Sequence, residues 1–117
     1  MSNNSFSFSG NRIQIGERYW EVEYPIGDAV LLDDKIIVLY DTGSAEAQLI
    51  NFRQFRNLVA YDLNGKKLWT AEHPTNETAG AYIEFLSSNP LKVWNFVGFI
   101  CEINPMNGKL IKSEFTK

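Results

Sequence analysis

The chain has one cysteine, one histidine and no long apolar run. Because Cys101 has no second cysteine to pair with, the sequence excludes an intrachain disulfide and a cysteine-based zinc cluster. The first residues lack the basic region and apolar core of a secretory signal, and no segment approaches the roughly 20 apolar residues that cross a bilayer. We therefore expect a soluble protein of a reducing cytoplasm.

Motifs of catalysis are also missing from the sequence. It contains no HExxH, GxSxG or P-loop pattern. The lone His73 directly precedes a proline at a predicted strand end, which favours a surface or turn role over a general base. Cys101 stands between isoleucines and is expected to be a small buried hydrophobe. We expect no enzymatic activity and no cofactor or metal. A hydrolase using Asp33 and Asp34 is a weaker alternative, because adjacent strand residues point to opposite faces.

Basic residues are fewer than acidic ones, at 11 against 14, which gives a net charge of -3. This balance argues against binding nucleic acid by phosphate neutralisation and permits a basic protein partner. A length of 117 residues is enough for one domain with its own core, and we expect residues 1–117 to form a single domain.

What the sequence does contain is a clear hairpin between Asn57 and His73. Asn64-Gly65 accepts the positive φ values of a two-residue type I′ turn. The resulting register pairs opposite charges, covers an aliphatic side chain with an aromatic one and places a small residue beside an indole. The expected pairs are Leu63 with Lys66, Asp62 with Lys67, Tyr61 with Leu68, and Ala60 with Trp69.

Other segments alternate with a period of two or form short apolar runs, which predicts further strands. The expected strands cover residues 5–9, 12–15, 19–24, 29–32, 36–40, 82–86, 91–96, 98–103 and 110–115. The segment from Thr42 to Arg56 is the one place where a short helix is expected, because Ala45, Leu49 and Phe52 recur at helical spacing. A packed loop is the alternative there.

The order of these signals repeats. Turn glycines at Gly65 and Gly108 lie 43 residues apart, within the 40 to 45 residues of a four-stranded propeller blade. Ala60-Tyr61-Asp62, Gly65-Lys66 and Leu68-Trp69 resemble the blades of PQQ-like, quinoprotein-type propellers. Ile103-Asn104, Gly108-Lys109 and Leu110-Ile111 match the same pattern, except that Lys112 stands where the blade tryptophan would be.

Two blades cannot close a ring that normally needs four or more, so the resemblance implies no propeller channel and no quinone site. We expect an all-β fold with two antiparallel four-stranded, blade-like sheets, from pseudo-repeats at about 26–73 and 79–116. The sheets would pack as a sandwich or as one coiled sheet, with an N-terminal hairpin over an exposed edge and at most one short helix.

The favoured function is a non-catalytic protein-binding module. Short acidic chains of this kind are typical of immunity proteins that neutralise a basic bacterial toxin, for example a nuclease delivered in contact-dependent growth inhibition. The alternative is an incomplete propeller-like module that self-associates or completes a sheet with a partner. Candidate partner-binding residues are polar side chains at turns and in the segment before the hairpin: Asp28, Asp33, Asp34, Asp41, Glu46, Gln48, Asn51, Arg53, Arg56, Glu72, Glu77 and Glu84.

Overall fold

A computed structural model of the chain describes residues 6–43, 56–74, 81–95 and 98–115. These residues form eleven strands and no helix. The strands are β1 (Phe6–Ser9), β2 (Arg12–Ile15), β3 (Arg18–Glu21), β4 (Ile26–Leu32), β5 (Lys35–Tyr40), β6 (Leu58–Asp62), β7 (Lys67–Thr70), β8 (Tyr82–Ser88), β9 (Leu91–Asn95), β10 (Phe99–Ile103) and β11 (Leu110–Phe115).

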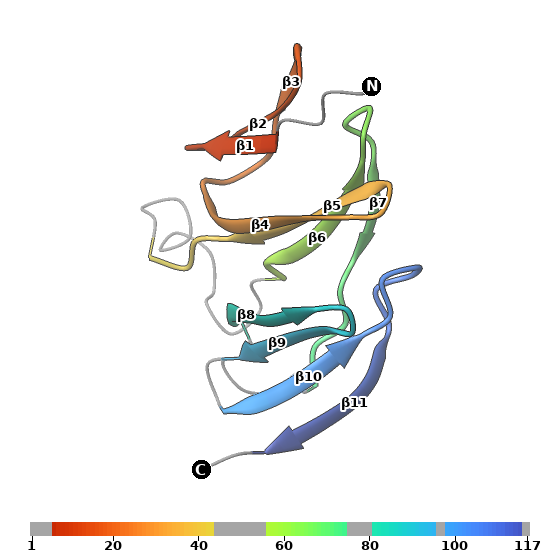
Figure 1. Ribbon diagram of the computed structural model, residues 1–117. Helices are drawn as coiled ribbons and strands as arrows, with labels where there is room; N and C mark the ends of the chain where they lie inside the picture. Colours follow the sequence, from red (N-terminus) through yellow and green to blue (C-terminus); the bar gives the residue numbers. More distant parts are fainter. Residues whose placement is uncertain (1–5, 44–55, 75–80, 96–97, 116–117) are drawn as a thin grey trace.

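The strands pair antiparallel in three sheets, each with its strands in chain order. We call β1–β3 the N-terminal sheet, β4–β7 the central sheet and β8–β11 the C-terminal sheet. Figure 1 shows the three sheets following one another along the molecule. The all-β prediction is confirmed. The arrangement differs from the expected one, because β3 pairs with β2 across a two-residue turn and converts the predicted N-terminal hairpin into a third sheet.

The inner strands of the central sheet, β5 and β6, are buried on both faces, as their apolar sequences predict. All six residues of β5 are buried. Ile36, Val38 and Tyr40 belong to a core shared with the N-terminal sheet. Ile37 and Leu39, one residue out of phase, belong to a second core shared with the C-terminal sheet. The alternation of side chains along one strand therefore joins all three sheets.

The hairpin between β6 and β7 has a different turn from the predicted one. Ala60 faces Trp69 as expected, but Tyr61 faces Lys67, because a bulge shifts the register by one residue. The backbone N–H of Gly65 donates to the carbonyl of Asp62 at 3.1 Å, and only Gly65 of the turn has a positive φ, of 91°. This is a three-residue loop with a glycine bulge, and the type I′ prediction is wrong. The Asp62 carboxylate favours it by accepting from the N–H groups of Asn64 and Lys66.

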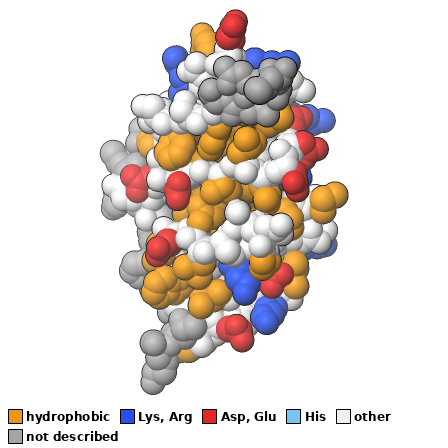
Figure 2. All heavy atoms as spheres, in the orientation of Figure 1, with side chains coloured by type: hydrophobic (Ala, Val, Ile, Leu, Met, Phe, Trp, Pro, Cys, Tyr) orange, Lys and Arg blue, Asp and Glu red, His pale blue; other side chains and the backbone are white. Residues whose placement is uncertain are grey.

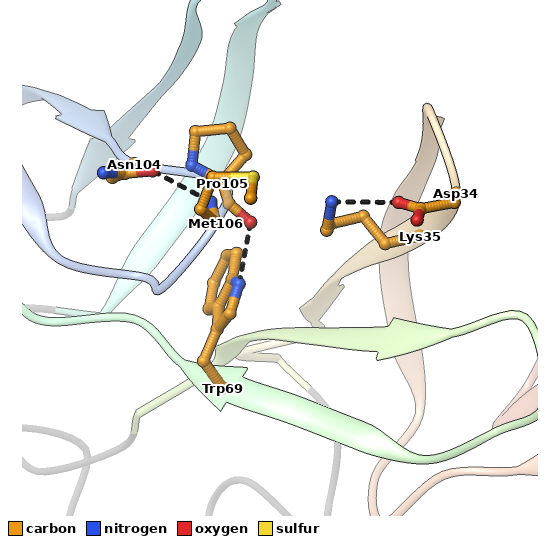
Figure 3. Close-up of polar contacts among 6 residues, drawn as sticks. All are labelled: Asp34, Lys35, Trp69, Asn104, Pro105 and Met106. Atoms are coloured by element: carbon orange, nitrogen blue, oxygen red, sulfur yellow. Dashed lines mark hydrogen bonds and ion pairs between the residues drawn. The ribbon is translucent and has the colours of Figure 1, made fainter.

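A tryptophan of the N-terminal sheet contacts a turn glycine of the central sheet, and a tryptophan of the central sheet contacts a turn glycine of the C-terminal sheet. A Cβ on Gly65 would lie 3.1 Å from the ring of Trp20, and one on Gly108 would lie 2.6 Å from the ring of Trp69. The Trp69 indole N–H also donates to the carbonyl of Pro105 at 2.9 Å (Figure 3). Both tryptophans follow a turn glycine by four residues, and the same position after Gly108 is Lys112. The series of contacts therefore stops at the C-terminal sheet.

A buried amide links the central and C-terminal sheets. Asn57 is 0% exposed, and its Nδ2 donates to the carbonyls of Tyr40 at 3.2 Å and Tyr82 at 2.6 Å. Its Oδ1 accepts from the backbone N–H of Tyr82 at 2.9 Å. Because these partners belong to β5 and β8, one side chain satisfies backbone groups of both sheets at the point where they meet.

Most of the segment for which a helix was considered, residues 44–55, lies outside the described residues. The strands of the central sheet lie between residues 26 and 70, and those of the C-terminal sheet lie between residues 82 and 115. Within the described ranges, no helix is long and apolar enough to cross a membrane.

Candidate protein-binding groove

Three of the predicted acidic residues line one hollow between the central and C-terminal sheets. The hollow has a volume of about 270 Å³. It is lined by the open end of the β4–β5 hairpin, opposite the turn, and by the start of β8. Its acidic residues are Asp28, Asp41 and Glu84, and all three are exposed. We call this hollow the acidic groove. Its other lining residues are Gly27, Leu39, Tyr40, Thr42, Tyr82 and Ile83.

Local backbone geometry presents the two aspartates. A bulge between Ile26 and Asp28 interrupts the pairing of β4 with β5. The Asp28 carboxylate accepts from the N–H of Ala29 at 2.8 Å, and the Asp41 carboxylate accepts from the N–H of Gly43 at 2.9 Å. Each carboxylate is thereby held beside its own backbone.

The phenols in the groove remain neutral. The Tyr82 hydroxyl donates to the carbonyl of Glu72 at 2.7 Å, and the Tyr40 and Tyr61 hydroxyls lie 2.7 Å apart. Burial raises the pKa of Tyr82 and of Tyr40 above the usual tyrosine value, and the hydrogen bond to Tyr61 adds to the shift at Tyr40. Among the described residues that line the groove, the charged side chains are therefore the three carboxylates, and none is a lysine or arginine.

Apolar side chains continue the surface beyond the groove. Ile83 lines the groove itself and is 43% exposed. Trp94 stands opposite Glu84 on β9 and is 37% exposed, and Leu86 on β8 is 42% exposed. Figure 2 shows acidic side chains along the flanks of the molecule with apolar groups between them. Carboxylates beside exposed aromatic and aliphatic groups suit recognition of another protein.

The other predicted acidic residues lie elsewhere. Asp33 and Asp34 form the turn at the far end of the β4–β5 hairpin, about 17 Å from Asp28 along the strand. Asp34 binds the ammonium of Lys35 at 3.1 Å, and this hydrogen bond and charge lower the pKa of Asp34 (Figure 3). Glu72 accepts from the N–H of Leu110 at 2.7 Å and so connects two sheets.

Arg56, Glu72 and His73 line a second hollow of about 390 Å³. The His73 ring lies 4.4 Å from the ring of Tyr82, and its Nδ1 is 3.3 Å from the carbonyl of Ala71. Burial, together with the nearby Arg56 charge, lowers the pKa of His73 to about 4. The imidazole is therefore neutral at pH 7. It packs against Tyr82 in the irregular segment after β7, neither in a turn nor fully at the surface.

Five predicted contact residues lie outside the described parts of the chain: Glu46, Gln48, Asn51, Arg53 and Glu77. Within the described parts, no three histidine, cysteine or acidic side chains are placed to hold a metal ion. The thiol of Cys101 is buried, as predicted, and burial raises its pKa.

A family model for a domain of unknown function, DUF7957, matches residues 3–115. The chain belongs to this family. A comparison with curated proteins gives no match. The crystal structure of the computationally designed protein Ika8 is similar in fold, with a TM-score of 0.54 and 12% identity over 95% of this chain. The chain spans 36% of the length of that protein.

The acidic groove of this DUF7957 domain includes residues that the sequence analysis did not select. Tyr40, Tyr82 and Ile83 read as ordinary strand residues in the sequence, because nothing local shows that β5 and β8 meet. Asn57 is the residue from which a contact between these strands could have been predicted. A polar residue that starts an apolar strand, Asn57-Leu58-Val59, needs a buried partner, and that partner is the strand beside the groove.

Proposed function

We propose that this protein is a non-catalytic binding module, an immunity protein that neutralises a basic bacterial toxin such as a nuclease. The observation that carries the proposal is the acidic groove, in which Asp28, Asp41 and Glu84 come from three different strands or strand ends and meet beside Ile83. A net charge of -3 adds a favourable long-range field for a cationic partner.

Charge and apolar area would act at different steps of binding. The three carboxylates steer a basic surface toward the groove and fix its orientation. Ile83 and Trp94 supply exposed apolar area that the partner can cover. Asp28 and Glu84 form no ion pair with any described residue, so a lysine or arginine of the partner would not have to displace an existing one.

The weaker alternative is a propeller-like module that self-associates, with a sheet of another copy stacked face to face on the C-terminal sheet. The tryptophans of the N-terminal and central sheets each contact a glycine in the following sheet, whereas the equivalent position in the C-terminal sheet is the exposed Lys112. A further sheet would therefore meet an ammonium group in place of an indole, at the cost of its desolvation.

The test is binding and protection with the toxin domain encoded beside this gene. We expect a 1:1 complex on a sizing column and survival of cells that express both proteins. Asp28→Lys and Glu84→Lys should each weaken the complex, since each places a cation in the groove. Glu17→Lys makes the same change of charge at an exposed turn of the N-terminal sheet and serves as the matched control.

The effect of salt on the association rate distinguishes contact at the acidic groove from attraction by the net negative charge of the whole protein. Raising the ionic strength should slow association for the parent protein and for Glu17→Lys more than for the groove variants. The absence of a complex and of protection would refute the function. Equal weakening by all three substitutions would refute the groove as the contact site.

A further inference from the structure

The last strand, β11, forms an open edge of the C-terminal sheet. It pairs with β10 on one side, and among the described residues no strand pairs with its other side. Five of its six residues are exposed, including Ile111 at 54% and Phe115 at 58%. In Figure 1 this strand is the outermost dark blue arrow, beside the C-terminus. Its outward backbone N–H and C=O groups offer a template for another strand.

The sequence of this edge is complementary to itself in one antiparallel register. With Ser113 placed opposite Ser113 of a second copy, Lys112 faces Glu114 and Ile111 faces Phe115 of that copy. Each pair occurs twice because the arrangement is two-fold symmetric. Pairing with β10 is regular from Lys112 to Phe115, with a bulge at Ile111, so the central three positions lie on undistorted strand. Cross-strand ion pairs and aromatic–aliphatic pairs are the contacts that stabilise sheets.

Neighbouring registers are disfavoured by charge. A shift of two residues in one direction places Lys112 opposite Lys112, and the same shift in the other direction places Glu114 opposite Glu114. A shift of one residue sets Ile111 against Glu114. Like charges directly opposite each other destabilise a strand pair, so the two charges favour the register centred on Ser113 over the two registers shifted by two residues.

We propose that β11 pairs antiparallel with β11 of a second copy of this chain, with the two-fold axis at Ser113. The two C-terminal sheets then form one continuous eight-stranded sheet. Ile111 and Phe115 cover each other across the junction, and the open edge is removed from solvent. The surface is separate from the acidic groove, whose nearest strand, β8, lies at the opposite edge of the same sheet.

Charge exchange tests the register directly, using the purified chain alone in sedimentation equilibrium. The parent protein should show a monomer–dimer equilibrium. Lys112→Glu and Glu114→Lys should each raise the dimer Kd about tenfold, because two attractive pairs become repulsive. The double variant restores both pairs with reversed sign and should return the Kd to about the parent value. This rescue also separates the interface from any loss of monomer stability in the single variants.

Disulfide trapping tests the position of the axis. Residues directly opposite each other in an antiparallel pair have Cα atoms about 4.5 to 5.5 Å apart, within the range of a disulfide. Ser113→Cys should therefore form a covalent dimer under mild oxidation. Ser7→Cys places the same thiol on β1, an exposed edge strand of the N-terminal sheet, and should crosslink much more slowly.

A concentration-independent monomer would overturn the proposal, as would a dimer whose Kd ignores both charge reversals. Crosslinking of Ser113→Cys no faster than that of Ser7→Cys would also contradict it. None of these measurements involves the proposed toxin, so failure here leaves the proposed function standing, and failure of toxin binding leaves the dimer standing.

Discussion

Replacing Asn57 by leucine should destabilise the fold far more than the loss of one amide suggests. Leucine has nearly the same shape but removes a donor and an acceptor from a site that is 0% exposed. The Tyr82 N–H then loses its bond to Oδ1, and the carbonyls of Tyr40 and Tyr82 each lose one from Nδ2. Each buried group left unpaired costs about 1–3 kcal/mol. Some regain a partner by relaxation, so we expect a loss of about 3 kcal/mol.

Urea unfolding with a matched control measures this loss. Gln14→Leu removes an amide of similar chemistry from the exposed face of β2, where it makes one hydrogen bond to the carbonyl of Gly16. Its effect should stay within about 0.5 kcal/mol. Native-state hydrogen exchange should also show a faster Tyr82 amide in Asn57→Leu. A loss below about 1 kcal/mol, or an unchanged Tyr82 amide, would refute the role of Asn57 in joining the sheets.

Three further outcomes follow from the packing. Gly108→Ala should cost about 2–4 kcal/mol in thermal or urea unfolding, because its Cβ would lie 2.6 Å from the Trp69 ring and its φ is 76°, whereas Gly10→Ala has open space and should cost about 1 kcal/mol. The pKa of His73 is lowered to about 4 in the fold. Its neutral form therefore stabilises the protein above pH 6.5, this contribution is lost as the pH falls from 6.5 to 4, and His73→Gln should flatten the stability profile in that window. Cys101 is buried, so a thiol reagent should modify it only at the rate of unfolding, and rapid labelling of the native protein would contradict its position.

Local pattern predicted the strands well but not how they assemble. Apolar and polar residues alternate in Phe6–Ser9 and again in Arg12–Ile15, and both strands were expected. The third strand was expected too, yet nothing in its sequence showed that it pairs with β2 instead of extending alone toward Pro25. The turn at Asn64-Gly65 was misjudged for a related reason. The dipeptide fits a two-residue loop, and the Asp62 carboxylate, which caps a longer one, decides between them.

The candidate site was even less accessible to sequence reasoning. Asp28, Asp41 and Glu84 were selected as acidic turn and strand-end residues, but so were Asp33 and Asp34, which the hairpin places at its other end. Which carboxylates lie together depends on strand length, because the length of β4 and β5 separates the open end of their hairpin from its turn. It depends also on the contact of β8 with the β4–β5 hairpin. The alternation of apolar and polar residues along the sequence does not predict that contact.

Lys112 connects the architecture with the ways this protein can bind others. At the equivalent positions Trp20 and Trp69 commit the first two sheets to a neighbouring sheet of the same chain, each against a turn glycine. A lysine there leaves the C-terminal sheet without that contact and adds a charge to an exposed edge strand, a device that prevents indiscriminate pairing. Glu114, two residues on, makes the same charge compatible with one specific partner, a second copy of the edge. Lys112 thus offers no indole for a further stacked sheet, while the charges of this edge permit the pairing proposed for two identical chains.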